Sequence, residues 1–302
     1  MRVLEYTIPE EFDGKTVESF LRGHIKMSLA LLRSQKRVPD GITLNGVHTR
    51  SIDKIHTNDI LRVNLPDDEK ASIPSDYPLD IIYEDEDILV INKPAELPMH
   101  ESHNHQGDTL ANAVAGYLVR KGKPAVFRAV GRLDKGTSGA VLCALNTFAA
   151  SKLSGKIEKE YLAVPTGRYS ENVTVDKPIY RPDPIKTYRT ADDRGDIAVT
   201  HFFPLEWGDD YSLLLIRLET GRTHQIRVHS AYMGTPLYGD TMYGTADKDI
   251  KRQALHCKSL TFIHPVTNEK MTFEAPMPED MERLLERLRK SKYIGAVKIS
   301  SF

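Results

Sequence analysis

The chain has few cysteines, no long apolar run and no N-terminal signal sequence. Its 302 residues include only two cysteines, Cys143 and Cys257, which stand far apart. Two distant cysteines form neither a disulfide framework nor a zinc-ligand pattern, so we expect buried free thiols in a reducing compartment. The N-terminus, MRVLEYTIPEEF, holds no apolar core, and no stretch approaches the ~18 apolar residues that cross a bilayer. These absences predict a cytoplasmic protein without a membrane segment.

An excess of positive charge is also missing. The net charge is −1 at pH 7, whereas a nucleic-acid-binding protein is expected to have a basic surface. The acidic residues are concentrated, however, because residues 67–87 hold nine acids against a single lysine, Lys70. The rest of the chain is therefore net positive, and a basic face is compatible with the total.

The N-terminal part predicts a small αα-β module over residues 1–66. Residues 14–37 carry apolar side chains at three- and four-residue steps, which predicts helix, with Ser28 as a cap for a second short helix. Asn45-Gly46 favours a tight hairpin, and a strand follows in DILRVNL. The helical part has a basic face that is either simply solvated or binds RNA. Its basic residues are Arg22, Lys26, Arg33, Lys36 and Arg37.

A proline-containing acidic linker, residues 67–79, precedes a larger domain over residues 80–302. In that domain strand patterns mix with helix patterns, so we predict an α+β fold with a mixed, largely antiparallel central sheet. The helical segments are TLANAVAGYLVRKG, FAASKLSGKI and MPEDMERLLERLRK. HQIRVHSAY fits a strand or a strand that turns into a helix.

A glycine-rich segment, GRLDKGTSG (residues 131–139), places Asp134 in a tight loop before an apolar strand. A carboxylate in that position suits a nucleophile or a base, although it could equally cap a turn. The spacing Gly131-x4-Gly136 resembles the start of a phosphate-binding P-loop. Thr137 stands where that loop requires lysine, which excludes an NTPase site.

A second polar segment is LETGRTHQIRVH (residues 218–229). If it is extended, Gln225, Arg227 and His229 share one face. A metal site would use His224 and His229, but a strand would place them on opposite faces. A second histidine cluster lies in a loop that lacks a fourth-ligand pattern, so metal binding is disfavoured there too. That cluster consists of His100, His103 and His105.

Two further segments are less specific. NKPAELPMH (residues 92–100) predicts a stiff strand exit that carries Lys93 and His100. IEKEYLAVPTG (residues 157–167) predicts a strand that begins near Tyr161, and the pattern alone fits a core or edge tyrosine.

Together these segments resemble, in order, the motifs of the RluA/RluD-type family of RNA pseudouridine synthases. The resemblance covers roughly residues 80–290, and residues 14–65 are similar to the alpha-L RNA-binding module that many members carry. The matching stretches are NKPAELPMH, GRLDKGTSG, KEYLA, TGRTHQIRVHSAYMGTPLYGDTMYG and ALHCKSLTFIHP.

The resemblance implies an isomerase that converts uridine in RNA to pseudouridine. Asp134 would attack C6 of the base or C1′ of the sugar, and Arg227 would pair with Asp134. Tyr161 would stack on the extruded base and serve in proton removal from C5. Arg132 would fill the gap left in the RNA. Further substrate contacts are expected at Lys93, His100, Arg222, His224 and Gln225.

The reaction rearranges bonds within one nucleotide, so we expect no cofactor and no metal. The expected partner is RNA, with ribosomal RNA of the large subunit first and transfer RNA as the competitor, and the expected state is a monomer. The chain departs from the family pattern at Gly131, where histidine is usual, at Leu145 and at Cys257. Two alternatives stay open: a non-catalytic RNA-binding or ribosome-assembly protein on this fold, and a metal hydrolase that uses the histidines.

Overall fold

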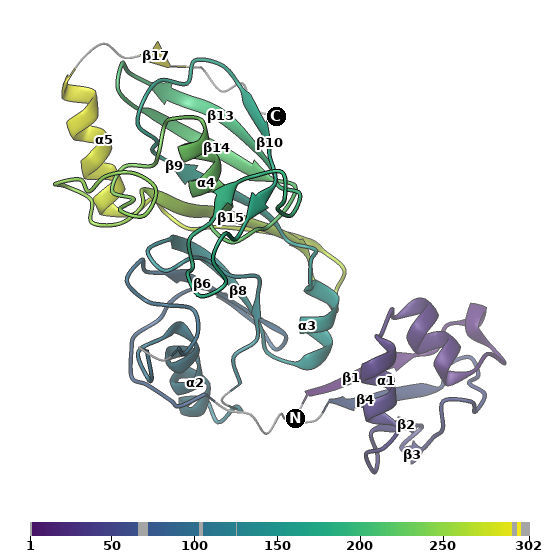
Figure 1. The fold of residues 1–302 in the computed structure, drawn as a ribbon. Coiled ribbons are helices and arrows are strands. Elements are labelled where there is room, and N and C mark those ends of the chain that lie inside the picture. The colour runs from purple at the N-terminus through teal and green to yellow at the C-terminus, as the bar shows by residue number, and fades with distance from the viewer. Residues whose placement is uncertain (1, 66–71, 103–104, 125, 292–294, 297–302) are drawn as a thin grey trace.

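The computed structural model describes residues 2–65, 72–102, 105–124, 126–291 and 295–296, and the chain forms two lobes (Figure 1). The N-terminal lobe, residues 2–65, is built on a four-stranded antiparallel sheet in the order β1-β4-β2-β3. Its strands are β1 (Arg2–Thr7), β2 (Ile42–Leu44), β3 (Val47–His48) and β4 (Ile60–Leu65). The sequence analysis did not predict β1, which pairs along its whole length with β4.

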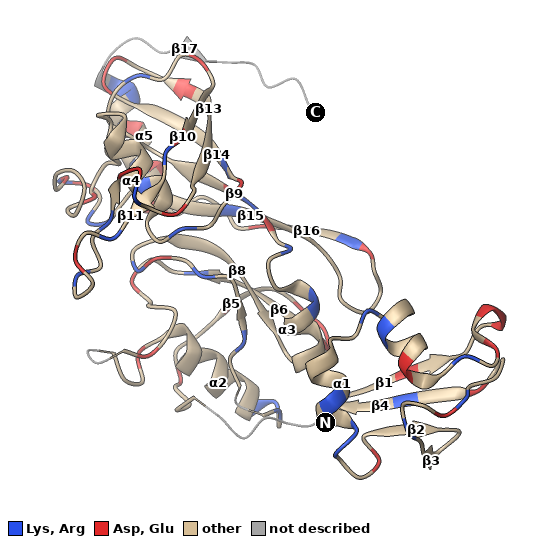
Figure 2. Cartoon of the chain, turned by 45° about the vertical axis from the view of Figure 1, so that its right-hand side comes forward, with Lys and Arg blue, Asp and Glu red and all other residues tan. Residues whose placement is uncertain are grey.

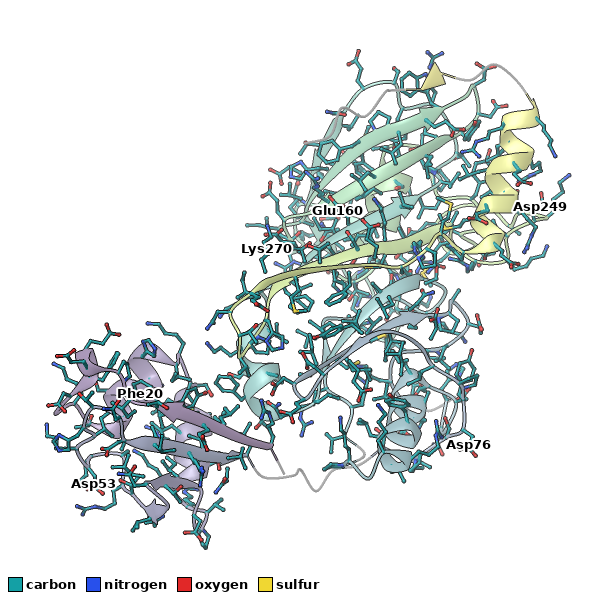
Figure 3. All side chains as sticks on the ribbon, turned by 180° about the vertical axis from the view of Figure 1, so that it is seen from behind. Phe20, Asp53, Asp76, Glu160, Asp249 and Lys270 are labelled. Carbon is teal, nitrogen blue, oxygen red and sulfur yellow. The ribbon has the colours of Figure 1, made fainter. Side chains whose placement is uncertain are left out.

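The helical part of this lobe is shorter than predicted. It consists of a π-helical turn, Ser19–His24, and helix α1 (Leu29–Gln35). Ser28 caps α1, as predicted, because its hydroxyl accepts the N–H of Leu31 at 3.2 Å. The predicted hairpin is also confirmed, with Asn45 at φ 54° between β2 and β3. Phe20 packs in the core of the lobe (Figure 3).

The C-terminal lobe, residues 72–296, contains the predicted α+β fold. Its main sheet runs in the order β10-β13-β14-β9-β15-β8-β6-β5. Among the described strands, the pairing of β8 with β15 is parallel and the others are antiparallel. These strands are β5 (Asp80–Glu84), β6 (Ile88–Lys93), β8 (Ser138–Ala144), β9 (Glu158–Ala163), β10 (Val173–Asp176), β13 (Val199–Trp207), β14 (Ser212–Leu218) and β15 (Leu255–Ile263).

In the described part of this lobe, short strands and helices complete the fold. The strands are β7 (Ala129–Val130), β16 (Lys270–Glu274) and β17 (Gly295–Ala296) at the main sheet, and β11 (Ile179–Tyr180) with β12 (Thr190–Ala191) as a separate pair. The helices are α2 (Leu110–Arg120), α3 (Thr147–Leu153), α4 (Gln225–Tyr232) and α5 (Glu279–Ser291). Both cysteines are buried and free, as predicted. No helix in the described ranges is long and apolar enough to span a membrane.

Helix α4 corrects the extended interpretation of residues 225–229. The side chain of Gln225 folds back, and its Oε1 accepts the N–H of Arg222 at 2.9 Å and the hydroxyl of Thr220 at 2.9 Å. These bonds hold residues 220–225 in a turn, and α4 begins at the end of that turn. The expected common strand face of Gln225, Arg227 and His229 is therefore wrong.

The two lobes share packing and one ion-pair cluster. Phe148 of α3 belongs to the buried apolar core of the N-terminal lobe, and Val266 packs against that core. At the start of β1, Arg2 donates two hydrogen bonds of 3.0 Å to the carboxylate of Asp87. Asp87 is 3% exposed and also accepts a 2.7 Å hydrogen bond from Asn146. The lobes therefore meet at a buried carboxylate, beside α3.

Replacing Arg2 is expected to weaken this contact. Arg2→Ala leaves the Asp87 carboxylate buried without its cation, at a cost of roughly 1–3 kcal/mol. Thermal unfolding measures the effect. Arg62→Ala is the matched control, because the Arg62–Glu5 pair on the same sheet is about half exposed and its loss should cost under about 1 kcal/mol. Equal losses of stability in the two variants would argue against a stabilising role for the buried Arg2–Asp87 contact between the lobes.

Little of the predicted linker can be compared with the structure. Residues 66–71 lie outside the described ranges. Residues 72–79 contain no helix or strand and run along α2, where the N–H of Ser75 donates to the carbonyl of Asn112 at 3.0 Å.

Candidate active site

A cleft of about 360 Å³ lies beside the parallel junction of β8 and β15 in the C-terminal lobe. Three segments form it: the loop after β7, strand β9, and the turn from β14 into α4. Polar residues that line it include Arg132, Asp134, Lys159, Tyr161, Arg222, His224, Gln225 and Arg227. Glu160, labelled in Figure 3, precedes Tyr161 on β9 but is not among the residues that line the cleft. Its carboxylate accepts a hydrogen bond from Arg217.

The loop that carries Asp134 is held by hydrogen bonds between its backbone and neighbouring segments of the lobe. The N–H of Gly136 donates to the carbonyl of Ala95 at 3.0 Å. The amide of Gln253 donates to the carbonyl of Lys135 at 2.9 Å, and Arg252 donates to the carbonyl of Gly136 at 3.0 Å. The Asp134 side chain is 16% exposed. The loop therefore presents a carboxylate at a fixed place in a largely closed cleft.

Two nitrogen groups face this carboxylate. Nη1 of Arg227 lies 3.8 Å and Nε2 of His224 lies 4.0 Å from Oδ2 of Asp134. Both distances exceed hydrogen-bond length, so these contacts leave the oxygen free to react beside a fixed positive charge.

Asp240, which the sequence analysis did not single out, holds Arg227. Nε and Nη2 of Arg227 donate to the two carboxylate oxygens of Asp240 at 2.7 and 2.8 Å. The Asp240 side chain has no exposed surface. Gly239 comes before it with φ +70°, and a Cβ there would lie 2.2 Å from the carbonyl oxygen of Arg252. Only glycine fits that backbone position, which sets Asp240 under the guanidinium.

Tyr161 is the aromatic wall of the cleft and is 7% exposed. Burial, with the nearby Cys257 and Asp134, raises the pKa of Tyr161 well above its usual value. Its phenol therefore stays protonated near pH 7. A neutral phenol suits stacking on a nucleobase better than it suits the removal of a proton. Of the two roles expected for Tyr161, the structure therefore favours stacking.

Lys159 also lines the cleft and was missed by the sequence analysis. It stands two residues before Tyr161, on the same face of β9. Its Nζ lies 2.9 Å from the place that a Cβ on Gly131 would take. Burial lowers the pKa of Lys159. Gly131, one of the departures from the family pattern, thus leaves space that this amine occupies.

The other predicted contacts divide into two groups. Arg132, Arg222 and His224 line the cleft. Gln225 lines it as well, but its amide nitrogen is bound to the carbonyl of Val199 and to Thr200.

Lys93 and His100 are not among the residues that line the cleft. Lys93 is fully buried, and its amine donates to the carbonyls of Pro94 and Leu97 at 2.8 and 2.9 Å. Burial, then the charge of Arg252, lowers the pKa of Lys93 to about 7. Lys93 therefore braces the NKPAEL turn beside the Asp134 loop, and the ring of His100 packs against Phe127.

Among the described residues, the histidines singled out in the sequence analysis do not form a group of candidate metal ligands. His229 is fully buried, and its ring nitrogens contact Thr200 and the carbonyl of Lys177. His103 lies outside the described residues. Within the described ranges, the one group of three candidate ligands is Asp85, Asp87 and His264, between the lobes. There Asp87 is already paired with Arg2.

Comparison with protein families matches residues 87–232 to the RNA pseudouridylate synthase family. Two relatives come from Bacillus subtilis. The uncharacterised RNA pseudouridine synthase YjbO is 46% identical over 69% of this chain and 76% of its own length. The uncharacterised RNA pseudouridine synthase YlyB is 38% identical over 96% of this chain and its full length.

A third relative carries a substrate in its name. Ribosomal large subunit pseudouridine synthase D of Vibrio vulnificus is 40% identical over 72% of each chain. Among solved structures, human RNA pseudouridylate synthase domain containing 1 matches with a TM-score of 0.54 and 27% identity. That match covers 72% of this chain and 97% of the human chain.

Proposed function

Because this chain belongs to the RluA/RluD-type family of RNA pseudouridine synthases, we propose that it isomerises specific uridines in large-subunit ribosomal RNA. The enzyme class is that of the family, an isomerase that acts on RNA. The relative from Vibrio vulnificus, named for the large ribosomal subunit, supports ribosomal RNA as substrate. Transfer RNA is the second candidate.

The observation that carries the proposal is a carboxylate, Asp134, in a cleft with a cation and an aromatic wall. Asp134 attacks C6 of the uracil ring or C1′ of the ribose, and the N1–C1′ bond breaks. The uracil turns, C5 bonds to C1′, and the bond between Asp134 and C6 or C1′ breaks, which frees the carboxylate. The hydrogen at C5 leaves as a proton, and N1 gains a proton. Substrate and product are isomers, so the balanced reaction requires no oxidant, reductant or energy source.

The surrounding residues take supporting roles in this proposal. Arg227, fixed by Asp240, holds a positive charge beside the reacting carboxylate of Asp134. Tyr161 stacks on the extruded base. Arg132 is exposed at the cleft and enters the RNA stack where the uridine has left. Pseudouridine formation thus requires Asp134 and Arg227 to act as a pair.

We further propose that residues 1–66 bind RNA, residues 67–79 link, and residues 80–302 catalyse. The π-helical turn, helix α1 and the residues that follow each of them carry exposed basic side chains, some visible as blue segments in Figure 2. The exposed residues are Arg22, Lys26, Arg33, Lys36 and Arg37. A monomer in the cytoplasm remains the prediction.

The salt dependence of RNA binding tests the role of the N-terminal lobe. Replacing Arg33, Lys36 and Arg37 by glutamine is expected to weaken RNA binding. The magnitude of the slope of log K against log salt should fall by up to about 2, because each phosphate that loses a cationic contact keeps its counterion. Titrations at several salt concentrations measure it. The control removes three other exposed cations of this lobe, Lys15, Arg50 and Lys54. An unchanged slope in the first variant would contradict RNA binding by this face.

The substrate itself is tested by mapping pseudouridines in RNA from cells with and without the gene. The proposal expects one or more uridines of large-subunit ribosomal RNA to lose the modification, and to regain it when the wild-type gene is returned. Loss confined to transfer RNA would replace the proposed substrate with the second candidate. Unchanged maps of both RNA classes would contradict the proposed substrates.

A further inference from the structure

Tyr243 contacts both groups that face Asp134. Its hydroxyl oxygen lies 2.9 Å from Nδ1 of His224, and its ring centre lies 5.0 Å from the guanidinium carbon of Arg227. Tyr243 itself is not among the residues that line the cleft. Its contacts with His224 and Arg227 connect it to the residues that do line the cleft.

The hydrogen bonds of the Tyr243 hydroxyl bear on which ring nitrogen of His224 carries hydrogen. The backbone N–H of Arg189 donates to the Tyr243 oxygen at 2.9 Å. Burial raises the pKa of Tyr243 to about 12, so the hydroxyl keeps its proton. The proton of this hydroxyl is available to Nδ1 of His224, and when Nδ1 accepts it a neutral imidazole carries its hydrogen on Nε2. That nitrogen is the one 4.0 Å from Asp134.

The neutral form of His224 agrees with its surroundings. Burial lowers the pKa of His224, against the opposing charge of Asp134. The residue also has a left-handed backbone, with φ 59°, at the start of α4. A non-glycine residue in that conformation is held by its contacts, and Tyr243 supplies one of them.

The Tyr243 ring is fixed as firmly as its hydroxyl. Tyr188, from the segment between β11 and β12, stacks on it with ring centres 5.2 Å apart and planes at 26°. Oδ1 of Asp240, the carboxylate that holds Arg227, also accepts the backbone N–H of Met242 at 3.1 Å and of Tyr243 at 3.3 Å. One carboxylate thus sets the relative positions of the guanidinium and the ring.

We propose that Tyr243 is a positioning residue: its hydroxyl holds His224 with the Nε2 hydrogen toward Asp134, and its ring braces Arg227. This inference deepens the proposed function and rests on it for its kinetic part. In that role Tyr243 keeps a hydrogen-bond donor and a cation at fixed places beside the nucleophile. The uridine then meets a preorganised site.

Tyr243→Phe tests the hydroxyl, because it keeps the ring and removes the donor. Nitrogen NMR of protein labelled with ¹⁵N-histidine reports which ring nitrogen carries hydrogen, and His224→Gln identifies the signal. We expect hydrogen on Nε2 in the wild type and a mixture of tautomers in Tyr243→Phe. The single-turnover rate of pseudouridine formation should fall by about 10-fold or more, with RNA affinity within about 2-fold of wild type.

Two comparisons separate positioning from general stability. Tyr238→Phe removes a hydroxyl from the same segment, where it donates to the carbonyl of Asp210 at 3.0 Å, and should change neither readout. In a His224→Gln background, adding Tyr243→Phe should cost no more than about 2-fold, because the contact is already lost.

An unchanged His224 tautomer in Tyr243→Phe would overturn the inference. A wild-type rate in that variant, or the same loss with and without His224, would also overturn it. The NMR measurement uses the free protein and needs no turnover. A failure of the proposed function would leave the tautomer result standing, so the two failures can be told apart.

Discussion

Asp134→Asn is expected to abolish pseudouridine formation while RNA binding persists. The amide has nearly the same shape but lacks the negative charge that attacks the uridine, so the rate should fall by at least about 10³-fold, as for enzymes that lose a covalent nucleophile. The fold should tolerate the change, because the guanidinium and imidazole nitrogens that face Asp134 already lie 3.8 and 4.0 Å away. Pseudouridine is quantified in RNA after a single turnover with excess enzyme, and affinity is measured by titration.

The matched control is Asp209→Asn, an exposed carboxylate in the connection between β13 and β14. It removes the same charge far along the chain from the catalytic loop and should leave the rate unchanged. If Asp134→Asn retained a rate within about 10-fold of wild type, another group would have to start the reaction. Loss of RNA binding in that variant would instead assign Asp134 to recognition.

Arg227→Ala is expected to lower the single-turnover rate by about 10²–10³-fold, the range seen when one preorganised charge-stabilising group is removed. Without the guanidinium, Asp134 loses the cation that lies 3.8 Å from its carboxylate. The variant should also be less stable by roughly 3–5 kcal/mol, because Asp240 stays buried without its partner. Rate and thermal unfolding are therefore measured together.

A double variant separates the two effects of Arg227. Arg227→Met with Asp240→Asn removes both charges of the buried pair, so much of the lost stability should return. The rate should stay low, because Asp134 still lacks its cation. Recovery of both stability and rate would show that Arg227 has only a structural role.

The local elements of the fold were largely predictable from the sequence because their signals are local. The Ser28 cap, the Asn45-Gly46 hairpin and the helical periodicity of residues 279–291 each act within a few residues. Strand β1 was missed because its assignment depends on pairing with β4, more than 50 residues away. Periodicity within one segment contains no information on such a partner.

The candidate site was predictable only in part. GRLDKGTSG and LETGRTHQIRVH pointed to Asp134 and Arg227, and the fold brings those two side chains together. Nothing local showed that the guanidinium would bind Asp240 in two places, since that pair depends on the turn after α4. The alternating polar pattern at residues 225–229 suggested a strand, but the Gln225 side chain holds the preceding turn and residues 225–232 form helix α4.

Lys93 shows the reverse error. A lysine at the end of a strand, next to the site in the motif order, was expected to contact substrate. The structure places its amine on two backbone carbonyls, with no exposed surface. A polar residue in a recognisable motif can therefore stabilise a buried turn instead of binding substrate. The burial of its side chain distinguishes the two roles.

The most direct test is a crystal structure of Asp134→Asn bound to an RNA that the wild-type protein modifies. The account predicts one uridine out of the stack and in the cleft, its base against Tyr161. C6 or C1′ of that uridine should lie about 3–3.5 Å from the side chain of residue 134, the separation of groups poised to react. A uridine that stays stacked in the RNA, or that enters the cleft with both carbons far from residue 134, would contradict it.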